Sequence, residues 1–264
     1  MDVWQVLLLA LVQGVTEFLP VSSSAHLILA NQLFGWADQG LAMDVAVHVG
    51  SLLAVIGYFR RDLLAMLGPG AAPGFPGLPG RTLAVWLVAI TLPLIIAGAL
   101  FADFIGTHLR RVEVIAWASI VFGVLLYLAD RWAKKRLDAR SDQPQPRSMV
   151  AMGLAQVLAL IPGTSRSGVT ITAGLAAGMT RQAASRFAFL MAIPALGAAG
   201  AYSAMELIQA GAATNWGRVG LAVVASAIGA WACIGIFLKL VERIGMTPFV
   251  IYRIALGVIL LSLI

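Results

Sequence analysis

The longest uncharged runs in this chain approach the thickness of the hydrocarbon core of a lipid bilayer. Of the 264 residues, 60% are hydrophobic and only 11% are charged, which is too apolar for a soluble domain of this size. A helix needs about 20 consecutive apolar residues to cross the core. The four uncharged runs near this length are Thr82–Ala102, Val114–Ala129, Phe187–Met205 and Val219–Leu238. The sequence therefore predicts an all-α, polytopic integral membrane protein.

Two further runs are predicted to span the membrane although they contain polar residues. Leu41–Phe59 carries Asp44 and His48. Thr247–Ile264 carries only Arg253. Together with the four uncharged runs they predict six transmembrane helices. The opening residues MDVWQVLLLA have no basic segment, and no small-residue cleavage site follows them, so we expect no removable signal peptide.

Two other apolar regions are interrupted by proline and small polar residues. The run Val3–Leu19 ends at Pro20, and VSSSAH follows; we name this interruption the first break. The run Met149–Ile161 ends at Pro162, and GTSRSG follows; this is the second break. Irregular backbone at membrane depth is tolerated only where it is buried in protein or lines a cavity. Each break, with the short helical pieces beside it, therefore predicts a re-entrant helical hairpin.

The two breaks resemble each other in sequence. QGVTEFLPVSSS and QVLALIPGTSRS share a Gln, an apolar-proline pair and a Ser/Thr cluster at nearly matching offsets. Three predicted spans follow each break, and an odd number between the copies places them in opposite orientations. This pattern predicts an inverted-topology repeat whose broken helices meet near the midplane. We expect one membrane domain, with repeat one at about 1–132, a linker at about 133–148 and repeat two at about 149–264.

The basic residues of the predicted loops indicate the orientation. The residues of one side are Arg60, Arg61, Arg81, Arg131, Lys134, Lys135, Arg136, Arg140, Arg147, Arg181, Arg186, Lys239 and Arg243. The other side holds Arg110, Arg111 and Arg218. By the positive-inside rule the first side is cytoplasmic, so both termini are predicted to be extracytoplasmic. The net charge of +6 is thus a topology signal, and no nucleic-acid partner is expected.

Polar side chains at membrane depth gather at the two breaks. The candidates are Gln13, Glu17, Ser22, Ser23, Ser24 and His26 from the first hairpin, and Ser165, Arg166, Ser167 and Thr170 from the second. Gln13 and Glu17 are four residues apart, so they share one helix face. Burying an arginine costs about 2.5–3.5 kcal/mol on insertion scales, so Arg166 needs an anionic partner or ligand. A guanidinium among hydroxyls and helix N-terminal N–H groups suits a phosphate.

Hydrolysis of such a phosphate needs a nucleophile or water, a base and, in many enzymes, a metal ligand. The Ser, His and Glu residues of the first hairpin supply these groups. A structural interpretation stays open, in which Glu17 and Arg166 only form an ion pair between the hairpins and the serines cap helix ends. His26 and the many hydroxyls argue against it, because an ion pair needs neither. His48 either lines the site or packs, and Arg253 either snorkels or pairs, without an assigned role.

The segments QGVTEFLPVSSSAH and PGTSRSGVT resemble the two signature segments of the bacterial undecaprenyl-diphosphate phosphatase family, the bacitracin-resistance type. The resemblance covers essentially the whole chain. It implies hydrolysis of undecaprenyl diphosphate to the monophosphate and phosphate, which recycles the lipid carrier for peptidoglycan and other envelope polymers. It also implies a divalent cation, Mg or Ca, and an extracytoplasmic site in the bacterial inner (cytoplasmic) membrane. The sequence does not fix the oligomeric state and leaves a homodimer open.

By position, the resemblance makes Glu17 the second acid of the family's Glu/Gln-x-x-x-Glu pattern, which binds metal or acts as base. Ser23 and His26 match the catalytic hydroxyl and imidazole, and either fits the role of nucleophile. Arg166 matches the diphosphate-binding arginine. Gln13 takes the permitted Gln variant, which weakens a two-carboxylate metal site. The hydroxyls expected to bind substrate are those of Ser22, Ser24, Ser165, Ser167 and Thr170.

A transporter or flippase of a phosphorylated lipid or other anion is the alternative function. Inverted repeats with broken helices are also a transporter layout, so the predicted fold does not exclude it. Transport of an anion does not require a cluster of Ser, His and Glu, whereas hydrolysis does. Release of phosphate from a polyprenyl diphosphate in detergent, without any gradient, distinguishes the two.

Overall fold

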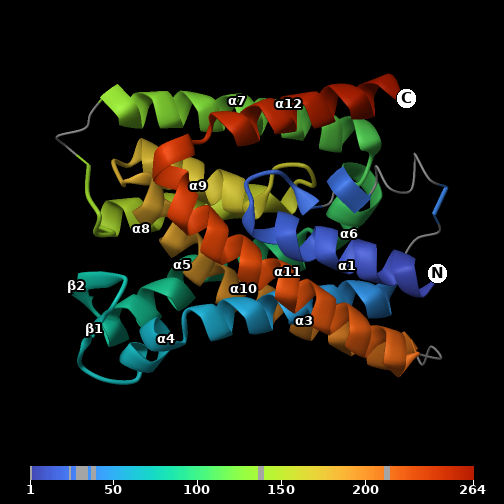
Figure 1. Cartoon of the computed structure of the whole chain (residues 1–264), viewed down its shortest axis with the longest axis horizontal. Helices are drawn as coiled ribbons and strands as arrows, with labels where there is room; N and C mark the ends of the chain where they lie inside the picture. The colour runs from blue at the N-terminus through green and yellow to red at the C-terminus, as the bar shows by residue number, and fades with distance from the viewer. Residues whose placement is uncertain (1, 24, 28–34, 37–39, 136–139, 211–214) are drawn as a thin grey trace.

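A computed structural model describes residues 2–23, 25–27, 35–36, 40–135, 140–210 and 215–264. This part of the chain is almost entirely helical (Figure 1). The helices are α1 (Val3–Phe18), α3 (Leu41–Tyr58), α4 (Arg60–Met66), α5 (Gly80–Leu100), α6 (Ala102–Phe104), the π-helix η1 (Ile105–Leu109), α7 (Val112–Lys135), α8 (Pro146–Gln156), the 3-10 helix η3 (Val157–Leu160), α9 (Arg166–Ala176), α10 (Arg181–Ala210), α11 (Trp216–Ile244) and α12 (Thr247–Ser262). The two strands of a small antiparallel hairpin are β1 (Ala71–Ala72) and β2 (Phe75–Pro79).

Five helices, α3, α5, α7, α10 and α11, are long and apolar enough to cross a membrane. They correspond to five of the six predicted spans, which confirms an all-helical, multi-pass membrane protein. The sixth predicted span forms α12, whose 16 residues place it with α1 and the α8–η3 segment among the shorter apolar helices. At 1.5 Å per residue, 16 residues rise about 24 Å, less than the core of about 30 Å. The arrangement of six spans with two re-entrant hairpins stays a prediction.

Both predicted breaks interrupt helices in the structure, because each contains a proline. Proline has no N–H to donate, and it disfavours helical geometry at the residue before it. Accordingly, Leu19 before Pro20 and Ile161 before Pro162 are extended, with ψ angles of 147° and 113°. The helices α1 and η3 therefore each end two residues before the proline.

The two breaks also share an unusual backbone conformation. Ser22 has a φ angle of 69° and Ser165 a φ angle of 67°, and they are the described non-glycine residues with positive φ. They lie 143 residues apart, the same separation as Gln13 and Gln156 of the two matching segments. The likeness that the sequence shows between the breaks therefore extends to their turns.

The two broken helices approach each other from opposite ends of the molecule (Figure 1). α1 starts at the end that carries both chain termini, whereas α8 starts at the opposite end. Where they meet, Ser167 Oγ donates a hydrogen bond of 2.8 Å to the Leu19 carbonyl. α9, which follows the second break, packs against α7, α8 and α10.

Small residues hold α1 and α3 close to α11. Gly14 of α1 and Gly50 of α3 lie so near the α11 backbone that a Cβ atom at either position would clash with it. Ser226 of α11 donates to the Val47 carbonyl at 2.7 Å and shares a hydrogen bond of 3.1 Å with Ser51. Close backbone approach and interhelical hydrogen bonds are the means by which helices associate in lipid. The end of α1 that precedes the first break is therefore held firmly.

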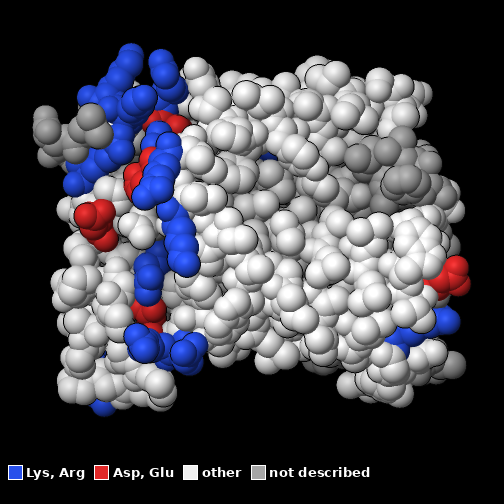
Figure 2. All heavy atoms as spheres, viewed as in Figure 1, with Lys and Arg blue, Asp and Glu red and all other residues white. Residues whose placement is uncertain are grey.

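Charged residues gather at the end of the molecule opposite the termini, where Figure 2 shows a band of Lys and Arg. Two ion pairs tie helices together there: Arg186 with Asp62 at 2.6 Å, and Arg181 with Asp130 at 2.5 Å. The exposed basic residues of the elements that end there are Arg60, Arg61, Arg81, Arg131, Lys134, Lys135, Arg147, Lys239 and Arg243. The predicted segregation of loop charges is thus present in the fold.

Candidate active site

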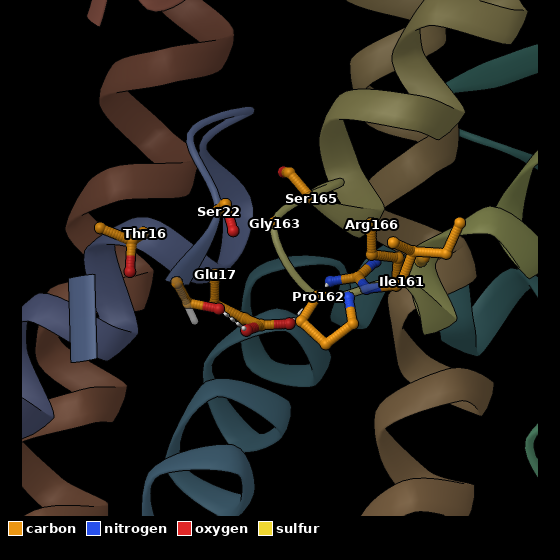
Figure 3. A pocket seen from close by; sticks show the side chains of 10 residues that line it. Thr16, Glu17, Ser22, Ile161, Pro162, Gly163, Ser165 and Arg166 are labelled. Carbon is orange, nitrogen blue, oxygen red and sulfur yellow. Dashed lines mark hydrogen bonds and ion pairs between the residues drawn. The ribbon is translucent and has the colours of Figure 1, made fainter. Parts of the chain in front are cut away.

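A cavity of about 130 Å³ lies between the two breaks, and we name it the central cavity (Figure 3). Its lining from the end of α1 and the first break is Thr16, Glu17, Ser22 and Ser23. Its lining from the second is Ala159, Ile161, Pro162, Gly163, Ser165 and Arg166. Five of the predicted site residues therefore share one cavity: Glu17, Ser22, Ser23, Ser165 and Arg166.

Glu17 is the centre of the hydrogen bonds in this cavity. Its Oε1 accepts from Arg166 Nη2 at 3.1 Å, and Figure 3 shows the two side chains pointing toward one another. Its Oε2 accepts from Gln13 Nε2 at 3.0 Å and from Ser23 Oγ at 3.4 Å. The Glu17 side chain is only 8% exposed. Three donors from both hairpins thus orient one buried carboxylate.

Arg166 lies where a helix begins, so its charge adds to that of the helix N-terminus. It is the first residue of α9, and the N-cap Ser165 accepts from the Gly168 N–H at 3.2 Å. The N-terminus of a helix carries a partial positive charge and N–H groups that bind anions. Besides its bond to Glu17, the guanidinium donates through Nη1 to the Ala188 carbonyl at 3.4 Å. The second break therefore presents a positive surface to an anion in the cavity.

Three predicted residues lie beside the cavity without lining it. Gln13 is 2% exposed and orients Glu17. Ser167 bonds to the Leu19 carbonyl, as described above. Thr170 is fully buried, and its hydroxyl donates to the carbonyls of Arg166 and Ser167 at 2.8 and 3.1 Å. These contacts hold the walls of the site, and a direct role in substrate binding stays a prediction. Ser24 lies outside the described residues.

His26 is linked to the cavity through the backbone of the first break. Its Nδ1 lies 2.7 Å from the Ser22 carbonyl, so this nitrogen carries the hydrogen. Its Nε2 then accepts from the hydroxyl of Tyr252 at 2.7 Å, and the two rings stack with centroids 5.5 Å apart. His26 is absent from the described lining of the central cavity. His48 bonds to the Asp44 carbonyl of its own helix.

Arg253 is the residue whose position the sequence analysis missed. It neither snorkels to the surface nor pairs with a described acid: it is 0% exposed and donates to four backbone carbonyls. The acceptors are Ser119 at 3.2 Å, Pro20 at 3.4 Å, Gly163 at 3.0 Å and Thr164 at 2.8 Å. Carbonyls of both breaks and of α7 thus converge on one guanidinium. The rule that ionisable residues inside a membrane are functional by default was the available signal.

Two glycines make room for Arg253. A Cβ atom at Gly168 would lie 2.5 Å from Arg253 Nη1, and one at Gly123 would lie 3.4 Å from Arg253 Cβ. The first distance is shorter than any normal contact, so a larger residue at Gly168 would displace the guanidinium. The absence of a side chain at Gly168 therefore lets Arg253 reach the carbonyls of both breaks.

The donor groups of the site fit a divalent cation that arrives with a phosphate ligand. Among the described residues, no group of three or more His, Cys, Asp or Glu side chains is placed to hold a metal by itself. Glu17 offers a carboxylate, and Gln13 Oε1 is a buried acceptor for which the described residues provide no hydrogen bond. Magnesium is commonly held by one or two carboxylates together with substrate phosphates.

The multi-pass helical fold and the buried carboxylate, hydroxyl and guanidinium define a membrane-embedded enzyme with a hydrolase-type site for an anionic substrate. The family described as "Bacitracin resistance protein BacA" matches residues 6–259, and the chain belongs to this family. Two relatives are similar over nearly their whole length. "Undecaprenyl-diphosphatase 2" of Stutzerimonas stutzeri (strain A1501) is 49% identical over 270 residues, covering 100% of this chain and 98% of that protein. "Undecaprenyl-diphosphatase" of Teredinibacter turnerae (strain ATCC 39867 / T7901) is 49% identical over 268 residues, covering 98% of each.

Proposed function

We propose that this protein hydrolyses undecaprenyl diphosphate to undecaprenyl phosphate and inorganic phosphate. The observation that carries the proposal is the contact of Glu17 with both Arg166 and Ser23 in one cavity built from the two breaks. The names of the two relatives supply the substrate. The reaction returns the lipid carrier to the synthesis of peptidoglycan and other envelope polymers.

Arg166 and the N-terminus of α9 bind the diphosphate in this scheme. A guanidinium bonds two phosphate oxygens at once, and the helix end adds N–H donors. The incoming phosphate competes with Glu17 for the guanidinium, so binding frees one carboxylate oxygen. Positioning and charge stabilisation dominate phosphoryl transfer, and these groups supply both.

Ser23 is the group best placed to attack the terminal phosphorus, directly or through a water that it positions. It lines the cavity and lies 3.4 Å from Glu17 Oε2, which accepts its proton. In the direct route the Ser23 Oγ–P bond forms while the bridging P–O bond breaks, and undecaprenyl phosphate leaves with the electron pair. Water then releases phosphate from Ser23. His26 supports the role of nucleophile less well, because it lies outside the described lining.

His26 is proposed to move protons at the edge of the site. Its Nδ1–H is held by the Ser22 carbonyl, and its Nε2 accepts from Tyr252. A divalent cation, Mg or Ca, would be held by Glu17 together with phosphate oxygens, and it would neutralise the developing charge.

The location proposed is the bacterial inner membrane, with the charged end of the molecule in the cytoplasm. The band of exposed basic residues supports this orientation. Both termini and the mouth of the central cavity would then be extracytoplasmic. The opposed entry of α1 and α8 supports the inverted-repeat arrangement with re-entrant hairpins.

The function is tested by phosphate release from undecaprenyl diphosphate by the purified protein in detergent, with no gradient. We expect turnover by the wild type and its loss in Ser23→Ala, with binding of the headgroup retained because Arg166 is intact. Binding of inorganic pyrophosphate to both proteins checks the second point. A wild type that binds the lipid without releasing phosphate would favour the transporter.

A further inference from the structure

A second hollow, which we name the lateral groove, runs along the lipid-facing side of α7 and has a volume of about 490 Å³. Its apolar lining is Val114, Trp117, Ala118, Val121, Phe122 and Ile161. The apolar α7 residues stand at positions i, i+3, i+4, i+7 and i+8, counted from Val114, so they occupy one face of the helix. Ala118 is small and buried between larger neighbours, which leaves a depression in this face.

The lateral groove borders the central cavity. Ile161, the residue directly before Pro162, lines both hollows. Near this point, Ser119 Oγ of α7 donates to the Gly163 carbonyl of the second break at 3.3 Å, which fixes the two elements against each other. One side chain therefore separates the anion-binding cavity from an apolar groove that faces lipid.

The groove changes in polarity along α7. Arg111 and Glu113 stand at its N-terminal end, paired at 3.5 Å with side chains 67% and 43% exposed. From Val114 onward to Phe122 the groove is apolar. A molecule with an anionic head and a hydrocarbon chain suits the two neighbouring hollows, with its head at Arg166 in the central cavity and its chain beyond Ile161 on the apolar face between Val114 and Phe122.

We propose that the lateral groove binds the part of the polyprenyl chain nearest the diphosphate and so delivers the headgroup to Arg166. The inference rests on the proposed function and adds the path of the lipid chain to it. A chain whose headgroup occupies a cavity of about 130 Å³ must leave that cavity through an apolar opening. The groove has the volume of a small-molecule site, about 300–1,000 Å³, and shares a wall with the cavity.

Lipid tails are as apolar as the groove, so the chain gains little from transfer out of the bilayer. The groove therefore acts through shape, by aligning the chain with the cavity. Filling it should block that alignment without disturbing the headgroup site. Val121→Trp places a large ring in the groove at a position that is 48% exposed, so folding should tolerate it. Val224→Trp is the matched control, since it makes the same substitution on another membrane-spanning helix, α11, at a position that is 56% exposed and outside the described lining of the groove.

The test compares kcat/KM for undecaprenyl diphosphate with inhibition by inorganic pyrophosphate, which presents the headgroup without a chain. We expect Val121→Trp to lower kcat/KM by about tenfold or more, because a chain that is out of line misplaces the headgroup and small misplacements cost up to about a hundredfold. Its inhibition constant for pyrophosphate should match that of the wild type, and Val224→Trp should match the wild type in both quantities. Equal kcat/KM in the two variants would overturn the proposal.

A second measurement does not depend on activity. A photoreactive p-benzoylphenylalanine at Val121 should crosslink undecaprenyl diphosphate, and pyrophosphate should compete with the reaction, while the same residue at Val224 should give no crosslink sensitive to pyrophosphate. Equal crosslinking at both positions would mean that bulk lipid fills the groove. Failure of the proposed function is separate, because it would appear as a wild type that releases no phosphate at all.

Discussion

Replacement of Arg253 by methionine tests whether this arginine holds the two breaks together. Methionine keeps a long, flexible apolar side chain but donates no hydrogen bond. In Arg253→Met the carbonyls of Gly163 and Thr164 lose donors that lie 3.0 and 2.8 Å away. The carbonyls of Ser119 and Pro20 lose longer contacts of 3.2 and 3.4 Å. Both breaks are left with buried acceptors that nothing replaces.

The two shorter hydrogen bonds, to Gly163 and Thr164, account for most of the expected loss of stability. A hydrogen bond from a charged donor contributes about 1.5–3 kcal/mol, so the loss of two removes about 3–6 kcal/mol. Removal of a buried charge offsets part of this, because its desolvation is itself unfavourable by several kcal/mol. We expect the free energy of unfolding to fall by about 2–4 kcal/mol. At about 2–4 °C per kcal/mol for a chain of this size, the Tm should fall by roughly 5–15 °C.

The assay is thermal unfolding of the purified protein in detergent, with turnover measured below both transitions. Turnover should fall about a hundredfold, because small displacements of Arg166 and Ser23 are enough for such a loss. The Tm and the turnover of Arg253→Lys should lie between those of the wild type and of Arg253→Met, since an ammonium keeps the charge without the planar fork. Arg243→Met is the control, because it removes one charge from an exposed position. A Tm and a turnover of Arg253→Met equal to those of this control would refute the reasoning.

Further predictions concern the site and the topology. Arg166→Lys should lose about a hundredfold in turnover while its Tm stays near that of the wild type, because the ammonium binds as a point charge and misplaces the phosphorus; near-normal turnover would leave Arg166 a generic electrostatic role. Tyr252→Phe keeps the ring stack on His26 but removes the 2.7 Å hydrogen bond to Nε2, so kcat should fall and its pH profile shift with little change in KM; an unchanged profile would argue that the contact is only structural. A cysteine at exposed Arg147 should react with an impermeant thiol reagent only after cells are opened, whereas one at Trp216 should react in intact cells; the reverse pattern would invert the topology.

The fold was predictable where apolar runs alone decide the outcome. The spans α3, α5, α7, α10 and α11 follow from hydropathy, because each is a long run with few charges. α12 starts at Thr247, as predicted, but hydropathy does not mark where a helix ends within an apolar run. Gly245, with a φ angle of 68°, ends α11, and α12 runs only from Thr247 to Ser262. The resulting helix is shorter than the apolar run that contains it.

The meeting of the two breaks was predictable because their residues are chemically complementary. A buried Arg166 requires an anion, and Glu17 is the acid at the matching depth of the other hairpin; the predicted contact is confirmed at 3.1 Å. The direction of each hydroxyl was not predictable, since a helical Thr or Ser can bond either to the preceding turn or to a ligand. The Thr170 hydroxyl bonds to the preceding turn, at the Arg166 carbonyl.

The contacts of α12 were not predictable from one sequence. Tyr252 lies 226 positions from His26, and no periodicity or motif connects the two. Arg253 is satisfied by backbone carbonyls, which carry no mark in the sequence. An argument from side-chain complementarity therefore finds Glu17 for Arg166 and finds nothing for Arg253.

The left-handed turns at Ser22 and Ser165 predict a trade-off between the stability and the activity of this protein. A non-glycine residue in that conformation is strained by about 1–3 kcal/mol, and glycine would relieve it. Both serines line the central cavity, so the residues that make the turns unfavourable also present hydroxyls to the ligand. A search for more thermostable variants should therefore select glycine at these positions, and the variants it finds should be slower enzymes.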